Sequence, residues 1–334
     1  MLALNMEKES MLRALLLAYH SLAAAKKRMR SSRVEPVYPF GDKLYNDLQK
    51  IASLSQEIID YDKPLVSILL PVYNEEVEII PTIVSLLYGI QDANIPTEII
   101  AVNNNSTDRS ADFLQRMGIR VVFCETPGLR FARNAGVQAS HLHSKYVWLI
   151  DADTRPLPPL KNKTSLENMY NPLKVSYAYL EAHEDCIAVS TGIKFEYQVF
   201  LRRLIKKLRL LIKGGHPFSC WAGANQFIEK KHLMAIGGID IEVDGGEDHH
   251  RVFQLIRYAK KEKLYLMGAD RNPALIAPVY TSDRRNTTIK QILKNVIQQY
   301  RKPKYAKDEY GLPIHPKGVR HKDLYGKERG SAKF

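Results

Sequence analysis

The sequence predicts an α/β fold with a mixed, mainly parallel sheet flanked by helices. Between residues 65 and 150, short runs rich in β-branched residues alternate with helical stretches, a pattern typical of right-handed βαβ units. The run 147–150 is apolar throughout, as expected of a strand that helices cover on both sides. With 334 residues, of which 45% are hydrophobic, the chain is long enough to build such a core.

Each element of this alternation has its own signal. The expected strands are 65–70, 98–102, 119–123 and 146–150, and the expected helices between them are 81–90, 108–117 and 130–139. Pro81 suits the first turn of its helix, where a missing N–H is tolerated. Beyond residue 150 the alternation becomes irregular. A further helix is predicted after 245–251, because apolar residues recur there at helical spacing, namely Val252, Leu255, Ile256 and Ala259.

The chain divides into three expected parts. Residues 1–60 form a helical N-terminal extension, and residues 61–300 form the main domain, with a nucleotide-binding half at 64–153 and an acceptor and catalytic half at 154–300. Residues 301–334 are rich in Lys, Arg and Pro and predict a basic, flexible tail.

The charge and the cysteines limit the partners and the compartment. A net charge of +13 favours anionic partners, which are nucleic acid, acidic lipid surfaces or phosphate-bearing small molecules. No nucleic-acid-binding signature is present, so nucleic acid is not the expected partner. Cys124, Cys186 and Cys220 lie far apart without a CxxC pair, which favours neither a disulfide framework nor a zinc site. A reducing, cytoplasmic location follows as an expectation.

Two amphipathic segments leave a membrane contact open. No run of about 18 apolar residues occurs, so no membrane-spanning helix is predicted. The segments 11–25 and 201–213 combine an apolar face with basic residues. Each can pack on the domain, or lie on an anionic membrane surface as a peripheral anchor.

Polar residues follow three of the expected strands, at 71–76, 103–108 and 151–153. Because ligands of open parallel sheets bind beyond the carboxyl ends of the strands, these residues are the candidate site. Neither GxGxxG nor GxxxxGK[ST] occurs, which excludes the usual dinucleotide fingerprint and the P-loop. Asp151 and Asp153 form a DxD pair of hard oxygen ligands, which suits Mg²⁺ or Mn²⁺ and, through the ion, a diphosphate.

Six segments occur in the order PVYNEE, NNNSTD, GLRFARNAG, WLIDAD, WAGANQFIEKK and GGEDHHR. Together, over about residues 64–290, they resemble the family 2 glycosyltransferases of the GT-A (Rossmann-like) fold. The resemblance implies a hexosyltransferase that uses a nucleotide-sugar donor and a divalent metal, Mn²⁺ or Mg²⁺, with inversion at the anomeric carbon.

The resemblance also implies roles for individual residues. Asp248 matches the catalytic base of an acidic pair with Glu247, and Asp153 matches the metal ligand. The positions that match the nucleotide-sugar site are Pro71, Tyr73, Glu75, Asn103, Asp108, Arg130, Arg133, Asp151 and Ala152. The positions expected at the acceptor and around the diphosphate are Trp221, Gly223, Ala224, Arg284 and Arg285.

Asn103 departs from the family, which commonly has Asp there to accept a uracil N–H. Since an amide can both accept and donate, a GDP-sugar stays open beside the UDP-sugar that we favour. The acceptor is equally open between a soluble sugar, a glycan end, a small alcohol and a lipid carrier. The alternatives to an inverting enzyme are a retaining GT-A enzyme, a nucleotidyltransferase, and a basic membrane- or nucleic-acid-binding module without catalysis. The sequence does not indicate an oligomeric state.

Overall fold

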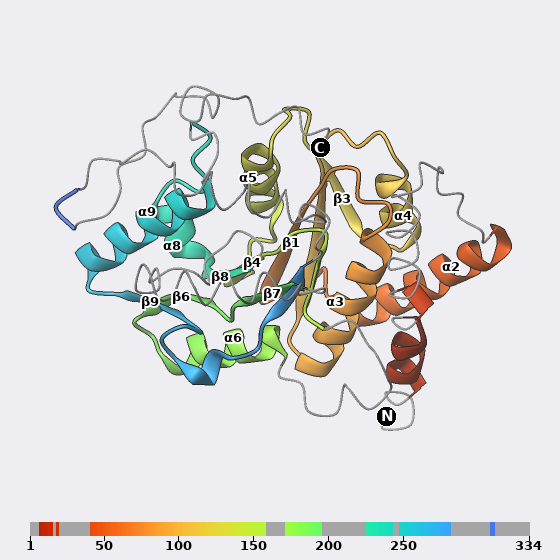
Figure 1. Cartoon of the computed structure of the whole chain (residues 1–334), viewed down its shortest axis with the longest axis horizontal. Helices are drawn as coiled ribbons and strands as arrows, with labels where there is room; N and C mark the ends of the chain where they lie inside the picture. Colours follow the sequence, from red (N-terminus) through yellow and green to blue (C-terminus); the bar gives the residue numbers. More distant parts are fainter. Residues whose placement is uncertain are drawn as a thin grey trace, which may run out of the picture.

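The computed structural model describes residues 7–15, 18–19, 41–157, 171–195, 225–242, 247–281 and 308–310. A seven-stranded sheet lies at its centre, with the strand order β3-β2-β1-β4-β8-β6-β9 (Figure 1). The strands are β1 (Val66–Val72), β2 (Thr97–Asn103), β3 (Arg120–Phe123), β4 (Tyr146–Leu149), β6 (Cys186–Ser190), β8 (Gln226–Glu229) and β9 (Tyr265–Gly268). The strands β1 to β4 are parallel, and β8 runs antiparallel to both β4 and β6. The predicted mixed, mainly parallel sheet is confirmed.

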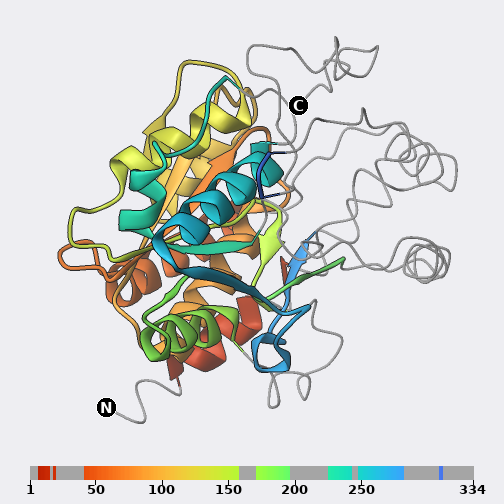
Figure 2. The same ribbon diagram turned by 90° about the vertical axis from the view of Figure 1, so that its left-hand side faces the viewer.

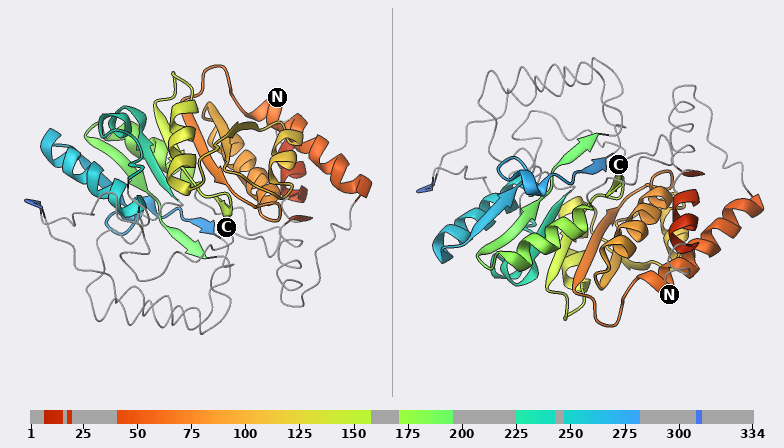
Figure 3. Two further views of the ribbon diagram at one scale, coloured as in Figure 1. Left: turned by 90° about the horizontal axis from the view of Figure 1, so that it is seen from above. Right: turned by 90° about the horizontal axis from the view of Figure 1, so that it is seen from below.

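Helices cover both faces of this sheet, as the views from different sides show (Figures 1, 2 and 3). One face packs against α2 (Gly41–Ile58), α3 (Ile79–Ala93), α4 (Ser110–Arg116) and α6 (Pro172–Ala182). The other face packs against α5 (Leu129–Ala139), α8 (Lys230–Ala235) and α9 (Glu247–Glu262). The helices predicted at 81–90, at 108–117, at 130–139 and after 245–251 are therefore present.

The two layers explain why the strands are apolar without alternation. Along β4, Tyr146 and Trp148 belong to the core under α3, while Val147 and Leu149 belong to the core under α5 and α9. Successive side chains of a strand point to opposite faces, so a strand between two helical layers needs apolar residues at every position.

A second, three-stranded sheet holds the chain that leaves the central sheet after β4. Its order is β5 (Thr154–Arg155), β10 (Val279–Thr281) and β7 (Ile193–Phe195), and the short helix η3 (Pro273–Leu275) precedes β10. Thr154 pairs with Thr281 across it. Because β5 begins directly after Asp153, this pairing fixes the backbone beside that carboxylate.

The N-terminal segment packs on the domain where it is described. Residues 7–15 are helical, and Leu12, Leu15 and Tyr19 are buried in the same core as α2 and α3. The Tyr88 hydroxyl donates to Glu9 Oε1 at 3.1 Å. Packing on the domain is thus the interpretation that these residues support. No helix in the described part of the chain is long and apolar enough to span a bilayer.

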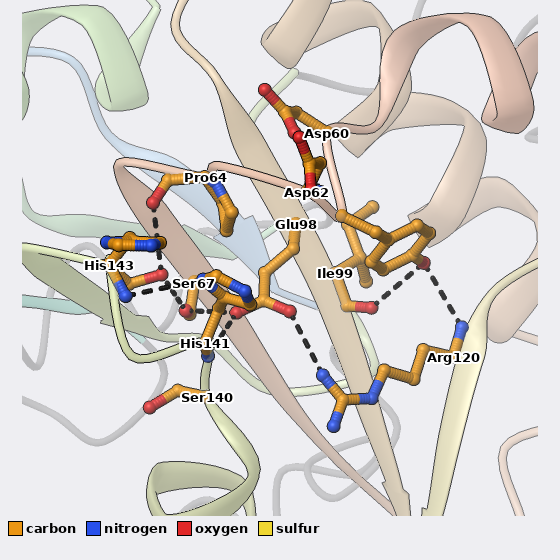
Figure 4. A network of polar contacts seen from close by, with 12 residues as sticks. Asp60, Asp62, Pro64, Ser67, Glu98, Ile99, Arg120, Ser140, His141 and His143 are labelled. Atoms are coloured by element: carbon orange, nitrogen blue, oxygen red, sulfur yellow. Dashed lines mark hydrogen bonds and ion pairs between the residues drawn. The ribbon is translucent and has the colours of Figure 1, made fainter.

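A polar network lies at the amino ends of the parallel strands, opposite the end where the candidate site was predicted (Figure 4). Glu98 of β2 is fully buried. It accepts hydrogen bonds from Ser67 Oγ at 2.5 Å and the His141 amide at 2.7 Å, and Arg120 Nη1 donates to it at 3.3 Å. The network ties β1, β2, β3 and the turn before β4 together.

Some predictions fall outside the described residues. These are the amphipathic helix 201–213 and nearly all of the basic tail 301–334, of which only 308–310 are described. Both stay predictions, as do the boundaries of the three expected parts of the chain.

Candidate functional site

The loops that follow β1 and β2 are joined by side-chain hydrogen bonds. Asn74 Oδ1 accepts from the Thr107 amide at 2.8 Å, and the Asn74 amide donates to Ser106 Oγ at 3.1 Å. The backbone of Asn74 is left-handed, with φ at 53°, a conformation that Asn tolerates better than most residues. The amide of Glu75 donates to Ser110 Oγ at 2.7 Å. The two loops thus form one connected edge, and Pro71 and Tyr73 lie at its start.

The end of β2 is connected in turn to the start of α5. Asn104 Nδ2 donates to the Thr126 carbonyl at 2.7 Å, and its Oδ1 accepts from the Gly128 amide at 2.7 Å. Gly128 has φ at 132°, which a side chain would strain. Asn103 is 6% exposed, and its Oδ1 accepts from the Ser106 amide at 3.1 Å.

Asp108 has a structural role in this edge. Its Oδ2 accepts from the Glu76 amide at 3.0 Å, and its Oδ1 accepts from the Ser110 amide at 2.9 Å. The helix expected from residue 108 begins instead at Ser110, because Asp108 stands before it as an acceptor for the first turn. Both carboxylate oxygens therefore hold protein backbone, a role that the sequence did not indicate.

The DxD pair follows β4 at the same edge. Ala152 is buried and Asp153 is 9% exposed, while the side chain of Asp151 is 35% exposed. Thr154 Oγ1 and Thr281 Oγ1 each lie 3.4 Å from Asp153 Oδ1. The small sheet thus orients one carboxylate of the pair and leaves the other more open.

Arg133 of α5 joins the DxD pair to α9. Its side chain is only 1% exposed. Nη2 donates to Asp151 Oδ1 at 2.9 Å, and Nη1 donates to Asp248 Oδ1. One guanidinium therefore joins three elements that lie far apart in the sequence: α5, the end of β4 and the first turn of α9. Sequence reasoning predicted all three residues for the site, but not their direct contact.

Burial and the neighbouring charges affect the protonation of Asp151. Burial raises the pKa of Asp151, the neighbouring Asp153 and Asp248 raise it further, and the Arg133 guanidinium lowers it. A positive charge beside Asp151 therefore favours its ionised form.

Arg251 is a site residue that sequence reasoning missed, although it ends the quoted segment GGEDHHR. It is 1% exposed. Its Nη2 donates to Asp248 Oδ1 at 3.3 Å, and its Nε donates to Gln226 Oε1 of β8 at 2.8 Å. The spacing of three residues on a helix was the available signal, since it places both side chains on one face.

Arg155 and Glu78 form a second arrangement that the sequence did not indicate. Arg155 of β5 is fully buried and donates to Glu78, the residue that precedes α3. No local pattern joins two residues so far apart in the chain. The pair links the small sheet to the helix that follows β1.

The donor set fits a divalent cation only in part. Asp151 and Asp153 offer carboxylate oxygens, which Mg²⁺ and Mn²⁺ prefer. Among the described residues, no three His, Cys, Asp or Glu side chains are close enough to hold an ion between them. An ion bound through one or two carboxylates and completed by phosphate oxygens would agree with this set.

Fewer contacts are described for the remaining predicted residues. Arg130 of α5 stacks on Phe131, with 4.7 Å from its guanidinium carbon to the ring centroid. Glu247 begins α9, and only its backbone is described. Five predicted residues lie outside the described part of the chain, namely Trp221, Gly223, Ala224, Arg284 and Arg285.

Comparison with known proteins assigns this chain to a family. Residues 67–232, which include the three polar strand ends and Arg133, match the profile described as Glycosyl transferase family 2. Residues 67–232 belong to this family. The expected family is thereby confirmed for these residues.

A curated relative of this family 2 glycosyltransferase is the uncharacterized glycosyltransferase EpsJ of Bacillus subtilis. It is 39% identical over 95 residues, which is 27% of this chain and 26% of EpsJ. The match thus spans about a quarter of the length of that relative.

Two solved structures are also similar to it. One is glucosyl-3-phosphoglycerate synthase from Mycobacterium tuberculosis, in complex with Mn²⁺, UDP-glucose and phosphoglyceric acid. It is 14% identical, with 80% of this chain and 84% of that chain covered and a TM-score of 0.45. The other is a mannosyltransferase from Pyrobaculum calidifontis, in complex with GDP-mannose and Mn²⁺. It is 16% identical, with 89% and 77% covered and a TM-score of 0.44.

Proposed function

We propose that this protein transfers a hexosyl group from a nucleotide-sugar donor to an acceptor hydroxyl, with inversion at the anomeric carbon. The observation that carries the proposal is the convergence of Asp151 and Asp248 on Arg133 at the carboxyl edge of a parallel sheet. Family membership supplies the reaction class, and this convergence supplies a site with a base and acidic ligands.

Asp248 is the proposed general base. An acceptor hydroxyl has a pKa far above 7, so a carboxylate must take its proton as the oxygen attacks the anomeric carbon. The side chain of Asp248 is 24% exposed, which leaves it accessible to an acceptor. The bond from the anomeric carbon to the diphosphate oxygen breaks as the new glycosidic bond forms on the opposite face.

The departing nucleoside diphosphate gathers negative charge, and the site offers positive charge to meet it. Arg133 and Arg130 lie on α5, and guanidinium groups bind phosphate oxygens through paired hydrogen bonds. Asp153, with Asp151 beside it, would hold a divalent cation, Mn²⁺ or Mg²⁺, which stabilises the leaving diphosphate electrostatically when bound.

The nucleobase of the donor and the acceptor are proposed as classes. We favour a UDP-sugar and keep a GDP-sugar as the alternative. The side-chain oxygen of Asn103 accepts from the Ser106 amide, so its amide nitrogen is the group that we assign to the base, and a donor can serve a carbonyl of either uracil or guanine. For the acceptor we keep a glycan end, a small alcohol and a lipid carrier at an anionic, cytoplasmic membrane face.

The release of nucleoside diphosphate from a panel of UDP- and GDP-sugars with Mn²⁺ tests the proposal. We expect release by the wild type and a large loss in Asp153→Asn. Asp112→Asn is the matched control, because Asp112 is an exposed carboxylate on α4 paired with Arg116. A β-configured product from an α-linked donor would support inversion, and retention of configuration would support the retaining alternative.

A further inference from the structure

Arg133 lies between Asp151 and Asp248, two carboxylates to which the proposed reaction gives roles of their own. Its side chain is 1% exposed, and the guanidinium contacts Asp151 through one nitrogen and Asp248 through the other. In the proposed function, Asp151 belongs to the metal and donor side and Asp248 to the acceptor side. Neither carboxylate is therefore in its working contact while Arg133 holds both.

The charges around Arg133 explain why it is held there. Asp153 and Asp248 both act electrostatically on Asp151, so Asp151 has two like charges nearby. A guanidinium stays charged at any relevant pH. Arg133 therefore supplies positive charge directly beside Asp151, one of the two carboxylates that would hold a divalent cation.

Two cations compete for such a site. A divalent ion beside Asp151 and Asp153 would repel the nearby guanidinium, and this repulsion is strong where water is scarce. A diphosphate reverses the balance, because it is an anion that can bind the ion and the guanidinium together. Arg133 therefore weakens the binding of the metal ion alone more than the binding of the metal ion together with the nucleotide.

We infer that Arg133 is an internal counter-ion, which opposes binding of a divalent cation on its own and moves from Asp248 to the diphosphate when the nucleotide binds. This inference rests on the proposed function. It makes the binding of metal and nucleotide mutually dependent, since coupling between two ligands is reciprocal. It also frees Asp248 for the acceptor only when a donor is present, so that Asp248 is not available to take a proton before the donor has bound.

Titration of Mn²⁺ followed by electron paramagnetic resonance tests this inference without any turnover. Wild type, Arg133→Gln and Arg133→Lys are compared, first without nucleotide and then with UDP or GDP. Arg116→Gln is the matched control, since it removes the same charge from a surface ion pair in which both side chains are about half exposed, 48% for Arg116 and 47% for Asp112.

We expect Arg133→Gln to bind Mn²⁺ without nucleotide at least about tenfold more tightly than the wild type, as removal of one nearby like charge predicts. Nucleotide should then increase its Mn²⁺ affinity by a smaller factor than in the wild type. Arg133→Lys, which keeps the positive charge but loses the two-armed guanidinium, should show a smaller gain, and it replaces the Gln variant if that variant does not fold. Arg116→Gln should match the wild type.

Unchanged Mn²⁺ affinity in the Arg133 variants would overturn the inference. Its failure is distinguishable from failure of the proposed function. If wild type binds Mn²⁺ with UDP or GDP but the variants gain nothing, the counter-ion role is wrong and the function stands. If no nucleotide binds and the variants still gain Mn²⁺ affinity, the counter-ion role stands and the function is wrong.

Discussion

Arg251 lies three residues after Asp248 on α9, and its Nη2 is 3.3 Å from Asp248 Oδ1. Its Nε is anchored 2.8 Å from Gln226 Oε1 of β8. The proposed base is therefore fixed to the central sheet through a buried arginine. Since a base must be placed within hydrogen-bond reach of the proton that it takes, this link bears directly on turnover.

Asp248→Asn should reduce the release of nucleoside diphosphate by about 10²-fold or more, the usual contribution of a general base. Binding of the nucleoside diphosphate should be kept, because the side chain retains its size, and the loss of its charge weakens its contact with Arg133 rather than a contact to the nucleotide. Turnover and nucleotide affinity are measured on the same preparation. Unchanged turnover would remove Asp248 from the mechanism.

Arg251→Met should lower kcat by about 10- to 100-fold, because misplacement of a reacting group by about 1 Å has an effect of this size. The dissociation constant for nucleotide should change much less. Arg257→Met is the matched control on the same helix, since Arg257 pairs with Asp308 rather than with the base. Equal losses in the two variants would show that Arg251 acts only through helix stability.

Glu98→Gln should lower the free energy of unfolding by about 1–3 kcal/mol, because Glu98 is fully buried and an amide cannot accept all the hydrogen bonds that its carboxylate accepts. Nucleotide binding should be unaffected, since Glu98 lies at the opposite end of the strands from Asp151. Urea denaturation measures the loss. Asp112→Asn, at an exposed carboxylate, should change stability by less than about 0.5 kcal/mol, and a similarly small change for Glu98→Gln would contradict the prediction.

Cys186 should resist alkylation in the folded protein. Burial raises the pKa of its thiol to about 12, so near pH 8 almost none of it is the reactive thiolate, and the fraction rises only as the pH approaches 12. Cys124 is less buried than Cys186 and should react before it. Mass spectrometry after brief iodoacetamide treatment locates the label, and rapid native labelling of Cys186 would contradict the burial.

The sequence predicted the first half of the fold closely because its signals are local. The apolar run of β4 and the spacing of Ile83, Val84, Leu87 and Ile90 on α3 reflect burial that any such helix or strand requires. The small sheet was not predicted, since β5 has only two residues and its partners lie far along the chain.

The residues of the site were predicted by likeness, whereas their relationships were not. Asp151, Arg133 and Asp248 appear in recognisable segments, but no spacing tells that one guanidinium contacts both carboxylates. Asp108 is expected at the nucleotide, which stays a prediction. Its hydrogen bonds to the loop and to the start of α4 are a further role that the sequence did not indicate. Such roles depend on tertiary packing, which local patterns do not encode.

A thermal-shift panel of UDP, GDP, dTDP, CDP and ADP, each with and without Mn²⁺, tests the central claim most directly. A ligand that binds only the folded state raises the melting temperature by mass action. We predict that one nucleotide stabilises the wild type in the presence of Mn²⁺, and that the effect is lost in Asp153→Asn but kept in Asp112→Asn. Absence of stabilisation by any of the five with Mn²⁺, or an equal shift in Asp153→Asn, would contradict a metal-dependent nucleotide-sugar site at this edge of the sheet.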